Sequence, residues 1–271
     1  MNPEHDWHDR IDQADKRLQE IEVVSTEFVA SCPYGVVQKF EGVMPRIALV
    51  ATMTAERQVP REISVTLAEV FSHLRSSLDH LMNALCVANG NATAPGGSQF
   101  PIFKNEPLFS ARDKIGNPKK GGGLYQMRGA SQIVQTIIES FQPYHGGTNF
   151  ANDPLWMVHD FAIVDKHRKP HVTGAILQGA SLGIVNMWGV DLFVSHWGVA
   201  AGAFKQGTEV GRVDFTVTDP HNYTVQMNTD FSYGVAFSEK GPGRGGLVVP
   251  TVNTLIAHLR DIVLPQLEPF V

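Results

Sequence analysis

The order of helical and strand-like segments in the sequence predicts an α+β fold. Residues 60–87 show a long helical periodicity, and residues 172–238 contain short runs rich in Val, Ile, Phe and Thr that alternate with turn signals. The two kinds of segment occupy separate parts of the chain, which favours α+β over α/β. No Pro/Ser-rich linker or charge block divides the 271 residues, so we expect a single elaborated domain.

The first elements expected are a helix over about residues 6–31 and a hairpin. In the helix, apolar residues recur every three or four positions: Trp7, Ile11, Ala14, Leu18, Ile21 and Phe28. Residues 34–41 and 46–54 are then rich in Val, Ile and Phe, and a Gly-Val-Met-Pro sequence separates them. This arrangement is typical of two antiparallel strands joined by a tight turn.

Residues 60–87 give the strongest helix prediction. Apolar residues follow the helical period throughout: Ile63, Leu67, Val70, Phe71, Leu74, Leu78, Leu81 and Leu85. Pro60 suits the first turn of a helix, and Asn89-Gly90 suits its end. At 1.5 Å per residue the helix would be about 40 Å long, so we expect it to be the central helix of the molecule.

After residue 130 we expect two helices, then a group of strands, and then a last helix. Helical spacing predicts helices over about residues 131–141 and 154–168. Four to six antiparallel strands are expected within 172–238, and a last helix over 250–267. The predicted fold is therefore a helical core at about 60–170 around the central helix, with an N-terminal hairpin and a C-terminal antiparallel sheet.

Composition excludes several classes of protein. Hydrophobic residues make up 43% and charged residues 18%, as in ordinary globular proteins, and neither a membrane-spanning run nor a secretory signal is present. The net charge of −5 argues against coating nucleic acid through bulk electrostatics. Cys32 and Cys86 lack metal-ligand spacing, and no cofactor motif occurs. We expect a cytoplasmic protein without metal or cofactor.

The sequence Arg75-Ser76-Ser77-Leu78-Asp79-His80 on the central helix is the sharpest chemical pattern. Histidine exchanges protons near pH 7, and the planar arginine fork matches phosphate oxygens, so Arg75 and His80 together suit metal-independent RNA transesterification. A single His80 cannot serve as both acid and base, so two copies would face each other in a dimer. We expect the stripe of Leu74, Leu78, Leu81 and Leu85 to form its interface.

A structural interpretation of the same residues stays open. Arg75 and Asp79 are one helical turn apart and can form an ordinary ion pair, with His80 partly buried beside leucines. His73 lies on nearly the same face as His80 and could support a site there. Arg75 and His80 are about 140° apart around the helix, so they do not stack on one face.

The Arg75 to His80 pattern resembles the R-x4-6-H motif of the HEPN superfamily. That resemblance implies a helical dimer whose motifs share a cleft, and a metal-independent endoribonuclease of toxin or defence type with Arg75 and His80 as catalytic residues and Ser76, Asp79 and His73 in support. The chain also resembles a group of uncharacterised bacterial proteins through four segments: Leu74–Leu81, Phe100-Pro101-Ile102, Gln142-Pro143-Tyr144 and Asp165-Lys166-His167-Arg168.

Lys166, His167 and Arg168 form a second cationic group. Cations at a helix end complement the helix dipole, which is a sufficient structural reason for them. Alternatively, the three residues bind an anion at the edge of the Arg75 and His80 cleft. His167 and His171 are spaced like a metal pair, but Pro170 interrupts the helix between them, so zinc binding is not expected.

Three functions are compatible with these patterns. The first is the dimeric ribonuclease, with RNA as substrate and an antitoxin or other protein as a possible partner. The second is a non-catalytic homodimer that binds a nucleotide or a partner, with Arg75, Asp79 and His80 in structural roles. The third is an enzyme that acts on a small anionic metabolite.

Overall fold

A computed structural model describes residues 6–31, 34–55, 59–91, 93–167, 172–196, 207, 209–237, 243 and 245–271. It confirms the α+β fold class, with helices and antiparallel strands in separate parts of the chain. Contacts divide the chain into two compact units that are discontinuous in sequence. The helical unit comprises residues 1–22, 61–171 and 248–271, and the strand unit comprises residues 23–60 and 172–247.

Because the segments of the two units interleave, no single cut in the sequence separates them. Residues 1–22 and 248–271, at opposite ends of the chain, belong to the same helical unit. Helix α1 (Asp6–Ala30) contributes residues to both units. The single elaborated domain stays a prediction, since contacts alone do not show whether either unit folds by itself.

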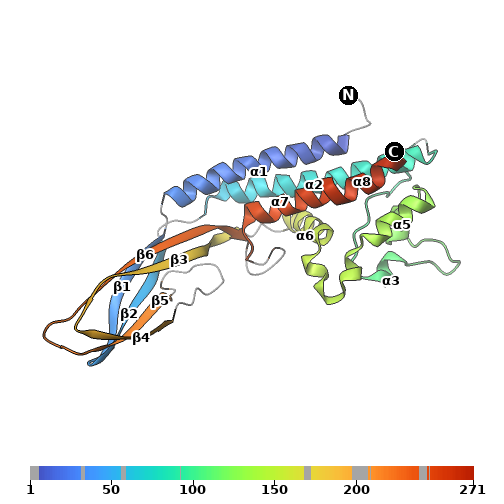
Figure 1. The fold of residues 1–271 in the computed structure, drawn as a ribbon. Helices are drawn as coiled ribbons and strands as arrows, with labels where there is room; N and C mark the ends of the chain where they lie inside the picture. The colour runs from blue at the N-terminus through green and yellow to red at the C-terminus, as the bar shows by residue number, and fades with distance from the viewer. Residues whose placement is uncertain are drawn as a thin grey trace. The chain divides into compact units, whose positions relative to one another are not determined.

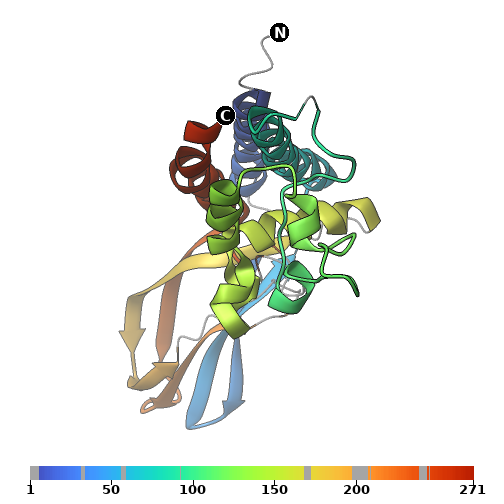
Figure 2. The same ribbon diagram turned by 90° about the vertical axis from the view of Figure 1, so that its right-hand side faces the viewer.

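Helix α2 (Arg61–Ala88) is the central helix of the helical unit, as its periodicity predicted. The first part of α1 and helix α7 (Val248–His258) run alongside it (Figures 1 and 2). Arg17 of α1 pairs with Glu69 of α2 at 3.0 Å, and the Phe71 ring stacks on Phe161 at 4.1 Å between centroids. The leucine stripe therefore faces neighbouring helices of its own chain.

The burial of this stripe overturns the predicted dimer interface. Leu74, Leu78 and Leu81 are completely buried, and Leu85 is 1% exposed. An apolar face that is already covered within one chain cannot also pair with a symmetry mate without unfolding. A homodimer, if formed, must use another surface.

The remaining helices of the helical unit include those predicted at about 131–141, 154–168 and 250–267, together with short helical segments that the sequence did not predict. They are α3 (Glu106–Phe109), α4 (Gly123–Gln126), α5 (Gln132–Ser140), η2 (Pro143–Asn152), α6 (Pro154–His167), η3 (Leu259–Val263), α8 (Leu264–Leu267) and η4 (Glu268–Phe270). Ser131 caps α5 by accepting the Val134 N–H. A wide π-helical turn precedes Pro265, where the proline ring would clash with the carbonyl of an α-helical turn.

The strand unit holds a four-stranded antiparallel sheet and a separate two-stranded ribbon. The sheet has the order β1-β2-β5-β4, and the ribbon pairs β3 with β6. The strands are β1 (Tyr34–Val43), β2 (Arg46–Ala55), β3 (Val172–Trp188), β4 (Val190–His196), β5 (Glu209–Val217) and β6 (Thr224–Phe237). The predicted hairpin is therefore part of the same sheet as two C-terminal strands.

The core of this sheet explains why the hairpin joins the later strands. Ile47 and Leu49 of β2 lie opposite Phe215 and Val213 of β5, and all four are buried on one face. An isolated two-stranded hairpin would leave these side chains in water, since it has no second layer to cover them. The sequence pattern located the two hairpin strands and the range 172–238 that holds the other four, but it contained no signal for this pairing.

Candidate functional site

Arg75 and Asp79 hold the backbone of Phe100 on both of its polar groups. The Arg75 guanidinium donates through Nη2 to Asp79 Oδ1 at 2.8 Å and to the Phe100 carbonyl at 2.7 Å. The Phe100 N–H donates to the same Asp79 oxygen at 2.9 Å. The spacing of one helical turn on α2 thus gives an ion pair that also fixes the segment that follows α2.

Gln142 fixes the next part of that segment. Its side chain is 1% exposed, accepts the Phe103 N–H at 3.0 Å, and donates to the carbonyls of Pro101 and Ile138 at 2.9 and 3.0 Å. Three of the four segments that carry the second sequence resemblance therefore meet in one place. Their polar side chains position the backbone of residues 100–103.

A cavity of about 310 Å³ lies between this segment, the middle of α2 and α6. Arg75 Nη1 is buried and has no hydrogen-bond partner among the described residues. The lining contains two cationic side chains, Arg75 and Lys104, and no carboxylate. It consists of Arg75, Gln99, Phe100, Ile102, Phe103, Lys104, Asn105, Leu108, Gly121, Gln126, Trp156 and His159. We call it the Arg75 cavity.

Aromatic rings hold Lys104 at the wall of the Arg75 cavity. Its Nζ lies 5.2 Å from the Trp156 ring centroid and 5.5 Å from that of Phe150, within the range of cation–π attraction. The His159 ring lies 5.5 Å from Trp156. Trp156 and His159 are three residues apart on α6 and therefore reach the same wall.

Burial governs the titration of the charged groups around this cavity. It lowers the pKa of Arg75, and the Asp79 carboxylate opposes that shift. It raises the pKa of Asp160, and the nearby Lys104 charge opposes that shift. A bound anion would favour the charged form of Arg75, because opposite charges attract more strongly in a poorly solvated site.

His80 lies in a different environment from Arg75. Its Nδ1 is 2.5 Å from Asp6 Oδ2 of α1, and the two side chains are 36% and 47% exposed. Arg10 Nε lies 4.0 Å from the other oxygen of Asp6. His80 lines a separate cavity of about 430 Å³ with Asp6, Trp7, Asn83, Ala84, Val87, Ala88 and Val271. Within one chain, Arg75 and His80 do not share a cavity.

The other predicted site residues contribute less to either cavity. His73 is partly buried, and burial followed by the charge of Arg10 lowers its pKa. Ser76 is partly buried and makes no side-chain hydrogen bond to any described residue. The side chains of Lys166 and His167, and the whole of Arg168, lie outside the described part of the chain, so the predicted anion-binding edge stays a prediction.

Sequence reasoning missed the residues that complete both cavities. Lys104, Trp156 and His159 reach Arg75 from two other segments, and Asp6 reaches His80 from α1. The i,i+3 spacing of Trp156 and His159 was the one available signal, but a helical face alone does not indicate which neighbour it meets. The pairing of Asp6 with His80 spans 74 positions and had no local signature.

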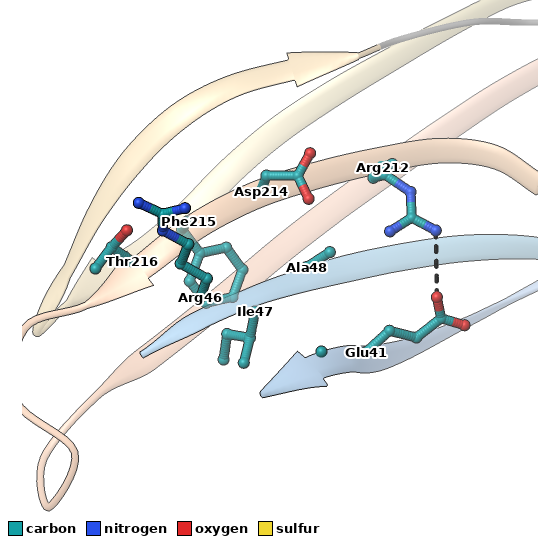
Figure 3. Close-up of a pocket in the computed structure, with 9 residues that line it drawn as sticks. Glu41, Arg46, Ile47, Ala48, Arg212, Asp214, Phe215 and Thr216 are labelled. Atoms are coloured by element: carbon teal, nitrogen blue, oxygen red, sulfur yellow. Dashed lines mark hydrogen bonds and ion pairs between the residues drawn. The ribbon is translucent and has the colours of Figure 1, made fainter. Parts of the chain in front are cut away.

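A larger groove of about 580 Å³ lies on the sheet of the strand unit (Figure 3). Arg212 of β5 donates there to Glu41 at 3.2 Å and to Glu209 at 2.9 and 3.0 Å, and the hydrogen bond to Glu209 is the main cause of its raised pKa. Asp214 also lines the groove. Glu41 and Asp214 line this groove, whereas no carboxylate lines the Arg75 cavity, so we take the Arg75 cavity as the candidate anion site.

Two further observations concern the part of the chain that the structure describes, and a third concerns its comparison with known proteins. No cluster of three or more His, Cys, Asp or Glu side chains there could hold a metal ion. No helix there combines the length and the apolar character needed to cross a membrane. Comparison of the chain with family models, curated proteins and solved structures gives no match. The resemblance to HEPN proteins thus stays an expectation from the motif.

Proposed function

We propose that the chain is a binding protein whose helical unit holds a small organic anion in the Arg75 cavity. The observation that carries this proposal is the Arg75 side chain, which lines a cavity that holds a second cation and no carboxylate, and whose buried Nη1 has no partner among the described residues. A buried donor without a partner costs about 1 to 3 kcal/mol, and more when it is charged. A ligand oxygen would remove that cost.

The composition of the cavity limits the ligand to an anionic head with an apolar or planar body. Arg75 and Lys104 supply the positive charge, whereas Ile102, Phe103 and Leu108 supply apolar surface. The volume of about 310 Å³ is at the lower end of ordinary ligand pockets. A phosphate or carboxylate carried on a ring system fits this description, and a mononucleotide is one such compound.

The arrangement of Arg75 and Asp79 supports binding rather than catalysis. The hydrogen bonds from Arg75 Nη2 to Asp79 and to the Phe100 carbonyl, which we call the Phe100 clamp, hold the guanidinium in place, and its Nη1 has no partner among the described residues. A fixed donor that needs no rearrangement favours tight and specific binding. A structural role for Arg75 and Asp79 is thus compatible with ligand binding.

The test is calorimetric titration of the purified protein with adenosine monophosphate, inorganic phosphate and adenosine at low salt. We expect the monophosphate to bind at least about tenfold more tightly than adenosine, because it adds charge-assisted hydrogen bonds. Lys104→Gln should weaken binding about tenfold. The matched control Lys114→Gln removes an exposed lysine outside the cavity and should bind as the wild type does.

Two outcomes would contradict the anion site. One is the absence of any heat or thermal stabilisation with phosphate or the monophosphate at about 10 mM, a concentration that detects even millimolar affinity. The other is equal weakening in Lys104→Gln and Lys114→Gln, which would indicate non-specific electrostatic attraction.

The pairing of His80 with Asp6 favours the ribonuclease as a second candidate. A carboxylate that orients an imidazole is a common arrangement for a general base, and His80 is exposed enough to meet a substrate. Arg10, rather than Arg75, would then supply the nearby positive charge. Such a site would cleave RNA without metal: His80 takes the proton of the 2′-hydroxyl as its oxygen bonds to phosphorus, and the 5′-oxygen leaves from phosphorus and takes a proton from water.

This second candidate is tested by incubating total RNA with the protein in EDTA. Cleavage by the wild type, its loss in His80→Ala by about 10²- to 10⁴-fold, and unchanged melting of that variant would support it. Intact RNA with wild-type protein across several substrates would reject it. The binding experiment above is unaffected by either result.

A further inference from the structure

Strand β1 is a long edge strand, and its backbone departs from the extended conformation at Gly42, where φ is 107°. Among the described strands it pairs with β2 alone, and its ten residues keep an unbroken register from Tyr34 opposite Ala55 to Val43 opposite Arg46. Val37, Phe40 and Val43 are 49%, 50% and 82% exposed. An exposed apolar edge without bulge or proline is a template for another strand.

The opposite edge of the sheet is much less suited to pairing. β4 (Val190–His196) has seven residues, and its register with β5 shifts between Phe193 and His196. Irregularities of this kind bend an edge strand and interrupt its row of hydrogen-bonding groups. Among the strands that the structure describes, β4 is therefore a protected edge and β1 an open one.

We propose that a second copy of this chain adds its β1 antiparallel to β1, with the two-fold axis at Phe40. The strand carries Val37, Lys39, Glu41 and Val43 on one face. A two-fold axis at Phe40 places Lys39 opposite the partner's Glu41 and Val37 opposite the partner's Val43. The edge is thus complementary to itself in charge and in apolar character.

This register is the one that the charges favour. An axis at Lys39 or at Glu41 would put two like charges directly opposite each other, which destabilises a strand pair. An axis between two residues would place Lys39 opposite an uncharged side chain. A lone lysine at an edge often prevents pairing, but Glu41 two residues away supplies the opposite charge in the Phe40 register.

The backbone and side chains at this edge are available for the pairing. Val43 pairs with Arg46 across a two-residue turn, and backbone groups alternate along a strand, so Phe40 directs its N–H and C=O away from β2. Glu41 uses Oε2 for Arg212 (Figure 3). A carboxylate accepts several hydrogen bonds, so Glu41 can serve both partners.

A disulfide test reports the register directly. In the Phe40→Cys variant, the two Cα atoms would lie about 5.5 Å apart, which suits a disulfide. In the control Gln38→Cys, the two equivalent positions are four residues out of register, about 13 Å apart. With Cys32→Ser in both variants, mild oxidation should cross-link Phe40→Cys and leave Gln38→Cys largely monomeric on a non-reducing gel.

A charge-swap series tests the same contact without a cross-link. Lys39→Glu should weaken dimerisation about tenfold or more in sedimentation experiments, because two attractive pairs become repulsive. The double variant Lys39→Glu/Glu41→Lys should restore most of it. Melting curves of all variants would show that the fold is retained. A wild-type chain that stays monomeric at about 100 µM, or equal cross-linking of both cysteine variants, would overturn the proposal.

Discussion

Arg75 and His80 lie five residues apart on the same helix, yet their surroundings differ in almost every respect. The Arg75 side chain is 14% exposed, and it holds both Asp79 and the Phe100 carbonyl. The His80 side chain is 36% exposed and meets Asp6, which is itself 47% exposed. The first residue belongs to a buried framework, and the second belongs to a half-open surface between two helices.

This difference shows what a spacing motif can and cannot specify. Five helical residues turn the chain by about 500°, so the two side chains end about 140° apart and meet different neighbours. Arg75 faces residues 99–108 and α6, whereas His80 faces α1. Arg75 and His80 could share one site only in a dimer, where the Arg75 of one chain would lie near the His80 of the other. The buried leucine stripe removes the surface that we had expected for this.

The largest effect should come from Asp79→Ala. The substitution leaves the buried Arg75 charge and the Phe100 N–H without their partner, so we expect the free energy of unfolding to fall by about 2 to 4 kcal/mol. Denaturant titration measures this change. Glu22→Ala, at an exposed position on α1, should change it by less than about 0.5 kcal/mol. A loss below about 1 kcal/mol in Asp79→Ala would mean that the hydrogen bonds of Asp79 to Arg75 and Phe100 contribute little to stability.

Gln142→Ala should have the next largest effect. Its buried amide makes three hydrogen bonds to backbone groups, and removing it leaves the Phe103 N–H and the Pro101 carbonyl without partners. We expect a loss of about 1 to 3 kcal/mol by the same titration. Gln132→Ala, an exposed residue in the first turn of α5, is the control and should be close to neutral. If both variants melted at the same temperature, the hydrogen bonds of Gln142 to residues 101, 103 and 138 would not stabilise the fold.

A third prediction concerns pH. Burial lowers the pKa of His258 below its ordinary value of 6.5, and the Asp153 carboxylate opposes that shift. The unfolded chain then binds more protons at His258 than the folded chain does, so stability is lost as the pH falls below 6.5. His258→Gln should make the melting temperature less dependent on pH in this range. An unchanged pH profile would contradict the lowered pKa of the partly buried His258.

The smallest effect should come from Asp6→Asn. The ion pair with His80 is partly exposed, and such pairs contribute about 0 to 1 kcal/mol, so the variant should melt within a few degrees of the wild type. The difference in stability loss between Asp6→Asn and Asp79→Ala measures how much more the Arg75 region contributes to the fold than the His80 region. A loss as large as that of Asp79→Ala would show that the His80 region is also a structural framework.

The sequence predicted the long helices and the hairpin strands well, because each depends on local periodicity, whereas the short helices α3, α4 and η2 carried no such pattern. The central helix, expected at 60–87, lies at 61–88, and the hairpin strands lie where their Val- and Ile-rich runs indicated. The sequence also offered the Arg75–Asp79 ion pair as one of two interpretations, because a helical turn is a local distance. The positions of these elements could be predicted because each depends only on residues that are close in sequence.

Contacts between distant segments could not be predicted in the same way. The joining of β2 to β5 depends on which buried face covers which, and no local pattern records that choice. The same holds for Lys104 and Trp156, which reach Arg75 from separate segments. The pairing of Gln142 with residues 101 and 103 was hidden because a glutamine before a proline also suits a simple helix end.

The most direct test of the account is a calorimetric titration of adenosine monophosphate into three proteins: wild type, Lys104→Gln and His80→Ala. If the Arg75 cavity binds the anion and His80 belongs to a separate surface, Lys104→Gln should weaken binding about tenfold, and His80→Ala should stay within about twofold of the wild type. Equal weakening in both variants would contradict the separation of the two residues. The absence of binding to the wild type would contradict the anion site itself.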